Sequence, residues 1–238
     1  MPVMPRSHDS SAATSAAFAL TLVLTLAACA SSGSAAPAAS AGQPAQGANA
    51  AAQSRDTGST DLLVPPGYGT LRQDDIAIKF QLSQVQVRAI PLDEPVIRLL
   101  SPDSYRTLHD LLESRRGQVA EVARRNGAPG YDVWYVQFFG LQPDVPFSPR
   151  EIVITNNGRD YRPIDIIPLT RGFGDQRLSQ REVQAGLYLF DASLDVMQPL
   201  TVTAETQRND NWQTVLRRLE QERAIVRSRA AQAPGTRP

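Results

Sequence analysis

Residues 30–60 contain no Val, Ile, Leu, Met, Phe, Tyr or Trp, so this stretch cannot contribute to an apolar core. Ala, Ser, Gly and Pro dominate it, and the interleaved Gly and Pro oppose a stable helix. Because it has too little apolar surface to offset the entropy of ordering, we expect a flexible tether. The folded core must therefore form from residues that follow it.

Charge divides the chain unevenly. The 24 Lys and Arg balance the 24 Asp and Glu. Residues 61–206 hold 19 acidic and 15 basic side chains, a net charge of −4, whereas 207–238 hold 7 Arg against 3 acids, a net charge of +4. The neutral total therefore hides an acidic body and a basic tail. A nucleic-acid-binding chain would be clearly basic, and we expect no nucleic-acid partner.

An uncharged apolar run covers residues 16–26. Its length is typical of a signal peptide and is too short to span a bilayer, which takes about 20 residues. The run leads directly into Leu26-Ala27-Ala28-Cys29, which contains the only cysteine of the chain. A single cysteine excludes an internal disulfide and a cysteine-based zinc cluster.

The quartet Leu26-Ala27-Ala28-Cys29 resembles the lipobox of bacterial lipoproteins. The resemblance implies that signal peptide 1–28 is removed, that the Cys29 thiol receives a diacylglycerol, and that the new N-terminus is acylated. Several acyl chains give stable membrane anchoring. Ala30 follows the cysteine, which by the same resemblance implies the periplasmic face of the outer membrane in a diderm bacterium. In a monoderm it implies the outer face of the plasma membrane. The alternative is an ordinary signal-peptide site beside an unrelated cysteine.

The predicted lipidated cysteine and tether together cover residues 29–60, and short strand patterns begin after them. Residues 76–83 alternate between apolar and polar, and a change of parity near Ser83 predicts a turn or bulge. Asn157-Gly158 predicts a type I′ hairpin turn. The remaining strand patterns cover 96–100, 133–139, 151–155, 159–167, 186–191 and 200–205.

These strands predict a mainly β (α+β) domain over 61–206, built as an antiparallel sandwich. Its layout loosely resembles the immunoglobulin-like domains of exported bacterial lipoproteins, and this resemblance implies no functional residues. Ser101-Pro102-Asp103 and a later Asn126-Gly127 delimit an inserted helix at about 102–125.

The C-terminal segment, 207–238, contains a predicted amphipathic helix at about 210–229. Its apolar face includes Trp212 and Leu219, whereas its basic residues include Arg217, Arg218 and Arg223. One interpretation is that the apolar face packs on the chain's own domain. The other is that the arginines contact an anionic membrane or an acidic envelope protein. Phe173 is a further candidate partner contact if its loop exposes it.

Candidate catalytic groups are few. His109 is the only histidine after the signal peptide, and its place within a helix favours a surface side chain over a Ser-His-Asp triad. Acidic residues remain available for acid–base hydrolysis, in pairs at 74–75 and 93–94 and singly at Asp191 and Asp195. The aromatic residues in 134–139 fit a core strand better than a sugar-stacking platform.

We therefore expect a lipid-anchored envelope protein that acts as a structural or protein-binding module, without a metal or another cofactor and without enzymatic activity. An envelope hydrolase that uses Asp and Glu carboxylates is one alternative. A carrier that holds an apolar ligand inside a barrel is another.

Overall fold

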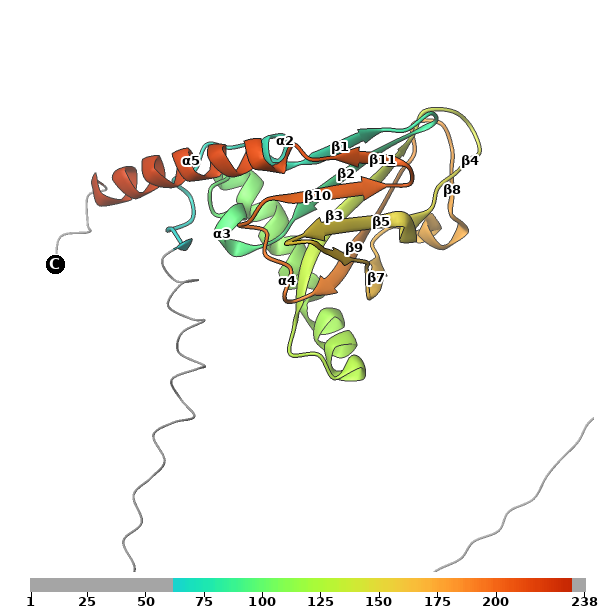
Figure 1. Ribbon diagram of the computed structural model, residues 1–238, viewed down its shortest axis with the longest axis horizontal. Helices are drawn as coiled ribbons and strands as arrows, with labels where there is room; N and C mark the ends of the chain where they lie inside the picture. Colours follow the sequence, from blue (N-terminus) through green and yellow to red (C-terminus); the bar gives the residue numbers. More distant parts are fainter. Residues whose placement is uncertain (1–61, 233–238) are drawn as a thin grey trace, which may run out of the picture. The chain divides into compact units, whose positions relative to one another are not determined.

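The computed structural model describes residues 62–232 (Figure 1). The predicted signal peptide, lipobox and tether lie outside these residues, as does the end of the C-terminal segment. The described residues form one hydrophobic core, to which both larger sheets and the long helices contribute.

The larger sheet has five antiparallel strands in the order β1-β2-β3-β9-β7. Their bounds are β1 Ile78–Gln81, β2 Val85–Pro91, β3 Tyr131–Gly140, β9 Val183–Asp191 and β7 Asp165–Pro168. β1 and β2 form a hairpin, which confirms the predicted turn near Ser83. β3 lies at the centre of the sheet, because its apolar side chains can be buried on a strand that has neighbours on both sides.

The second sheet has four strands in the order β11-β10-β5-β6, and a short pair joins β4 to β8. Their bounds are β11 Gln207–Asn209, β10 Leu200–Ala204, β5 Ile152–Asn156, β6 Arg159–Tyr161, β4 Val145–Pro146 and β8 Arg177–Leu178. Asn157 and Gly158 have φ values of 51° and 75°, and Asn156 pairs with Arg159 around them. The two positive φ values and the two-residue loop confirm the type I′ hairpin.

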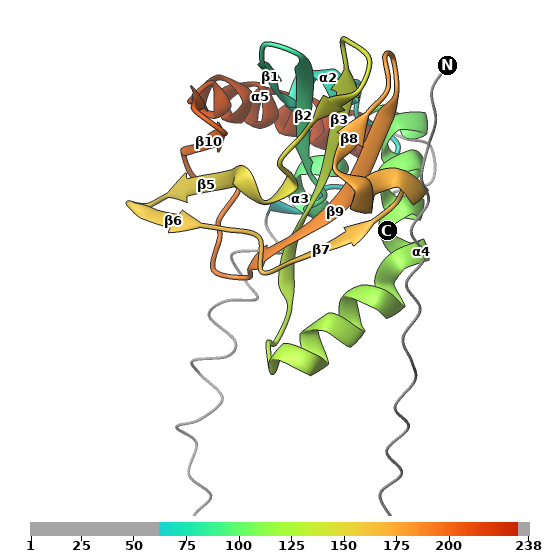
Figure 2. The same cartoon turned by 90° about the vertical axis from the view of Figure 1, so that its right-hand side faces the viewer.

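The predicted strand 159–167 is divided between the two sheets. β6 ends at Tyr161 and pairs with β5, whereas β7 begins at Asp165 and pairs with β9 (Figure 2). Pro163 lies between them and has no backbone N–H to donate to a ladder, so it suits the point where the chain changes sheets.

Two long helices flank the strands, α4 at Pro102–Asn126 and α5 at Trp212–Gln232 (Figure 1). Both predicted helices are thereby confirmed, and α5 continues past the expected end. Ser101 precedes α4, and Gly127 ends it in the left-handed region with φ 62°. Two short helices, α2 at Gln73–Ile76 and α3 at Glu94–Ile97, complete the set, with 3₁₀ turns at Pro149–Glu151 and Arg171–Asp175.

The predicted strand at 96–100 was wrong, since residues 94–97 form α3. Pro95 stands at the start of this helix, where its fixed φ is favourable and its missing N–H is not needed. Val96, Ile97 and Leu99 are all fully buried. The apolar run therefore reflects complete burial of a helical turn, which sequence periodicity alone cannot distinguish from a buried strand.

The apolar face of α5 packs on the chain's own domain. Trp212 and Leu219 are fully buried, and the Trp212 indole N–H donates to the Val196 carbonyl at 2.8 Å. Near the middle of α5, Glu222 accepts hydrogen bonds from the backbone N–H and the hydroxyl of Thr70, at 2.7 and 2.8 Å. Of the two interpretations of this helix, the structure therefore supports packing of its apolar face on the chain's own domain.

Candidate functional site

Phe173 is not a surface residue. It is 4% exposed, and its ring lies 5.6 Å from that of Phe147 and 6.3 Å from that of Phe138, measured between centroids. The condition for a partner contact, an exposed ring, is therefore not met. Burial in an aromatic cluster explains the phenylalanine at this position.

The three predicted contact arginines of α5 divide between surface and interior. Arg223 is 6% exposed, and its Nη2 donates to the Pro95 carbonyl at 3.4 Å, so it helps to hold α5 against α3. Arg218 lies at the surface in an ion pair with Asp75, at 2.8 Å. Arg217 is exposed and contacts Thr214 on its own helix. Only Arg217 and Arg218 thus remain candidates for an outward basic face.

His109 connects two helices. Its Nδ1 lies 2.9 Å from Glu94 Oε1 and 3.3 Å from the hydroxyl of Tyr105. The second oxygen of Glu94 accepts from Arg98 Nε at 2.5 Å. His109 is therefore half-buried and joins α4 to α3, where a plain surface side chain was expected.

Half of the aromatic residues at 134–139 belong to the core. Trp134 and Phe138 are buried on one face of β3, whereas Tyr135 and Phe139 are partly exposed on the other. The Trp134 ring contacts those of Phe190 and Trp212. The preference for a core strand over a sugar-stacking surface is thus supported by burial.

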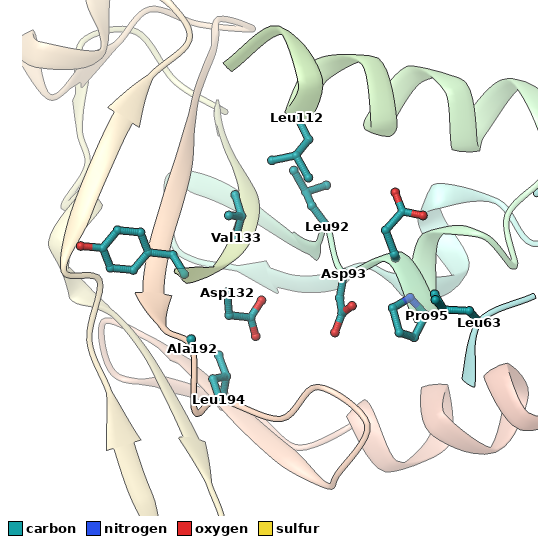
Figure 3. Close-up of a pocket in the computed structure, with 11 residues that line it drawn as sticks. Leu63, Leu92, Asp93, Pro95, Leu112, Asp132, Val133, Ala192 and Leu194 are labelled. Carbon is teal, nitrogen blue, oxygen red and sulfur yellow. The ribbon is translucent and has the colours of Figure 1, made fainter. Parts of the chain in front are cut away.

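One pocket brings acidic side chains together at the end of the larger sheet (Figure 3). It has a volume of about 390 Å³ and lies between α3, the start of β3, the loop after β9 and α4. We call it the carboxyl pocket. It is lined by Leu63, Leu92, Asp93, Glu94, Pro95, Leu112, Tyr131, Asp132, Val133, Ala192 and Leu194.

Strand register places Asp93 opposite Asp132. Pro91 pairs with Trp134 at the end of the β2–β3 ladder, and the Leu92 N–H donates to the Val133 carbonyl at 2.8 Å. The next position on each chain is then Asp93 and Asp132. Directly opposed residues have Cβ atoms about 4.5–5.5 Å apart in an antiparallel pair, and like charges there are destabilising. Figure 3 shows both carboxyl groups in the same space, on the side of Ala192 and Leu194.

Asp93 is not used to cap its helix. It occupies the position before α3, where an aspartate commonly accepts from the first backbone N–H groups, yet its side chain makes no capping bond. The backbone carbonyl of Asp93 accepts from Val96 and Ile97 instead. The carboxyl is therefore left free to enter the pocket.

Burial raises the pKa of both aspartates. The pKa of Asp93 rises to about 6, first because of burial and then because of repulsion from Asp195 and Glu94. The pKa of Asp132 rises well above its usual value, again because of burial and then because of the charge on Asp93. Both groups therefore bind their protons more tightly than an ordinary aspartate does.

Two buried polar atoms at this site lack a hydrogen-bond partner among residues 62–232, namely Asp132 Oδ2 and Trp134 Nε1. Trp134 lies two positions after Asp132 on the same strand face, close enough to favour the charged form of that carboxyl. Buried polar atoms are normally hydrogen-bonded, and the Trp134 indole N–H, which does not line the pocket, is a donor close to this carboxyl.

Several other acidic residues form ion pairs. Glu94 is paired with Arg98 and His109, as described above. Asp74 pairs with Lys79 and Arg88, and Asp191 pairs with Arg159. Neither Asp93 nor Asp132 forms an ion pair with any part of the chain that the structure describes. The two aspartates of the carboxyl pocket thus lack the basic partner that these other acids have.

The acidic candidates predicted from the sequence include the pair at 93–94 and Asp195, but not Asp132. The available signal was a charged residue near the start of an otherwise apolar strand, where a central strand tolerates few charges. Within 62–232, no three His, Cys, Asp or Glu side chains are grouped as a metal site.

No family model matches the chain, and comparisons with curated proteins and with solved structures find no similar protein. None of the helices between residues 62 and 232 is long and apolar enough to cross a membrane.

Proposed function

We propose that the protein is a lipid-anchored binding module of the cell envelope that recognises a ligand or a partner protein at the carboxyl pocket. Two partly buried carboxyl groups without a compensating cation carry this proposal. A structural module gains nothing from such a pair, because burial penalises each charge and the charges repel each other. Strongly perturbed acids in a pocket are a recognised indicator of a functional site.

The membrane part of the proposal rests on Leu26-Ala27-Ala28-Cys29, the lipobox motif. Acyl chains on Cys29 would hold the domain at a bilayer through the tether. The Ala30 position favours the outer membrane, facing the periplasm, if the cell has two membranes. Arg217 and Arg218 lie on the exposed side of α5 and would offer a second contact with an envelope protein, for which Arg218 would have to leave its ion pair with Asp75.

The immunoglobulin-like assignment is also kept as a proposal. Strands β1, β2 and β3 follow one another within one sheet, whereas an immunoglobulin-like sandwich sends its third strand to the opposite sheet. The sheet arrangement supports an antiparallel β domain with helices, and a fold comparison after experimental structure determination would test the finer class.

Crosslinking in cells followed by pull-down tests the binding module. Ala192 is exposed and lines the pocket, so Ala192→Phe narrows it without changing a carboxyl group. Ala120, which is exposed on α4, provides the matched control Ala120→Phe. We expect crosslinked partners of the native chain to persist with Ala120→Phe and to fall several-fold with Ala192→Phe. Equal crosslinking by both variants would show that the pocket is not the binding site.

A hydrolase is the second candidate, and the pKa of Asp93 favours it. An acid with a pKa of about 6 is suited to general acid–base catalysis near neutral pH, and a second carboxyl lies opposite it. Screening the native chain against glycoside and ester substrates tests this activity. Turnover that disappears in both Asp93→Asn and Asp132→Asn would establish it, whereas turnover that survives in both would reject these residues as catalysts.

The carrier of an apolar ligand needs an enclosed cavity. The larger sheet is open, with β1 and β7 at its edges, and the described pocket contains acidic groups. No observation on the described residues favours this alternative over the other two.

A further inference from the structure

We propose that the carboxyl pocket binds a primary ammonium or a guanidinium group carried on a short apolar stem. This inference rests on the proposed binding function and adds the chemical class of the ligand. Such a group occurs on a lysine or arginine side chain of a partner protein and on small amines.

Charge selects a cation. Asp93 and Asp132 face one another without a basic partner. The pocket therefore stays acidic although the third acid that lines it, Glu94, is paired with Arg98 and His109. An anionic ligand would add a third like charge to this site. A neutral ligand would leave the repulsion between the two carboxylates in place. A cation between them compensates both, which is the arrangement that buried charges require.

Hydrogen bonding selects a donor. Asp132 Oδ2 is buried and accepts no hydrogen bond from residues 62–232. An ammonium group offers three donors and a guanidinium group five, and neither has an acceptor. Bonds between such groups and a carboxylate are charge-assisted and stronger than neutral ones. The carboxyl of Asp132 has several acceptor sites and the nearby Trp134 indole N–H fills at most one of them, so a donor ligand fits the rest.

Shape selects an apolar stem. The volume of about 390 Å³ lies at the lower end of the range for small-ligand sites, roughly 300–1,000 Å³. The carboxyl groups occupy one side, and the remaining walls are mostly aliphatic. These apolar wall residues are Leu63, Leu92, Pro95, Leu112, Val133 and Leu194. A short alkyl chain would be covered by them, while its charged end reaches the carboxylates.

The charged and titratable groups around the pair come from every neighbouring element. They are Glu94 and Arg98 of α3, His109 of α4, Asp195 of the loop after β9, Tyr131 of β3 and Arg223 of α5. Arg98 and His109 are already engaged by Glu94, and Arg223 donates to a backbone carbonyl. The cation is therefore held by Asp93 and Asp132, with Asp195 adding negative potential.

Binding of a cation is expected to strengthen as pH rises. Because the pKa of Asp93 is about 6, roughly a tenth of this group is ionised at pH 5 and nearly all at pH 7.5. Affinity for the cation should therefore be about tenfold weaker at pH 5. The bound cation also lowers the pKa of both aspartates, so binding should release protons to the buffer wherever either group is still partly protonated.

Calorimetry on the full chain in a non-ionic detergent tests this inference, with n-butylammonium and n-butylguanidinium as probes. Butan-1-ol and butyrate are the neutral and anionic controls of the same stem. We expect both cations to bind and the two controls to bind at least about tenfold more weakly, since each lacks the charge-assisted bonds. Titrations in phosphate and in Tris, which differ in ionisation enthalpy, measure the proton release.

Asp93→Asn and Asp132→Asn should each weaken cation binding by about tenfold or more. Asp175→Asn changes an exposed aspartate outside the pocket and should bind like the native chain. Thermal melts confirm that each variant is folded. Ala192→Phe gives a second route to the same conclusion, because it narrows the pocket and leaves both carboxyl groups in place.

Three results would overturn the inference: equal binding of butan-1-ol, full binding by both Asp→Asn variants, or displacement of the probe by Ca²⁺ at equimolar concentration. None of these results would reject the proposed binding function, because a loss of crosslinking in Ala192→Phe would still show that a partner binds at the pocket. If Ala192→Phe left crosslinking unchanged while the native chain still bound the cations, the partner protein would be rejected and the cationic ligand would be retained.

Discussion

At the scale of single residues, Asp93 and Asp132 lower the stability of the folded chain. Each is partly removed from water, and the register of β2 and β3 sets them opposite one another. Both effects favour the neutral acids over the carboxylates. The folded state therefore binds protons more tightly at this pair than the unfolded state does.

This difference predicts how stability depends on pH. The pKa of Asp93 rises from 3.8 to about 6 on folding, so the folded state holds the extra proton between these values. The free energy of unfolding should then fall as pH rises from about 4 to about 6, by up to roughly 3 kcal/mol from this group. Asp93→Asn removes the ionisable group, and the variant should be more stable than the native chain at pH 7.5 but not at pH 3.5.

Urea unfolding at pH 3.5, 5, 6 and 7.5 measures the difference between the two proteins. Asp175→Asn is the control, because its carboxyl is exposed and its removal should leave the pH profile unchanged. A constant difference between the native chain and Asp93→Asn across this range would contradict the assigned pKa.

At the scale of secondary-structure elements, local chemistry decides which parts the sequence can predict. Asn157-Gly158 specifies its turn, because few other residues accept two successive positive φ values. α4 is predictable from residues at its two ends. α3 is not, because its four residues owe their conformation to burial between other elements. The carboxyl pocket is likewise not predictable from the local sequence, because it depends on the pairing of β2 with β3 across 40 residues of chain.

α5 illustrates an element whose stability comes from its packing. Leu219 is fully buried against the domain, whereas Ile225 on the same helix is 43% exposed. Leu219→Ala should destabilise the fold by about 2–5 kcal/mol, because it removes buried methyl groups and leaves a cavity. Ile225→Ala should change stability by no more than about 1 kcal/mol, since surface substitutions have small effects.

Chemical denaturation of both variants measures these free energies. The matched pair separates packing from helix propensity, because Ala replaces a large aliphatic residue within the same helix in each case. Equal effects of the two substitutions would mean that α5 leaves the domain in solution, with its basic face then free for a partner.

At the scale of the whole molecule, the basic C-terminal segment is joined to the acidic body by at least one ion pair. Arg218 of α5 pairs with Asp75, and Arg229 donates to the Tyr68 carbonyl. The charge division seen in the sequence is therefore used at least partly within the chain. This compensation does not extend to the carboxyl pocket, because no arginine of α5 pairs with Asp93 or Asp132 in the described residues.

Membrane attachment is the property of the whole molecule that is most directly tested. Cys29 is the only residue of the chain that a lipobox can acylate, because the motif requires a cysteine and the chain has no other. Cys29→Ala should therefore abolish labelling by radioactive palmitate and move the protein from the membrane fraction to the soluble fraction. Ser31→Ala, two residues further on in the tether, should keep both properties. If Cys29→Ala stayed with the membranes, attachment would have to arise elsewhere in the chain, and the exposed arginines of α5 would be the next residues to change.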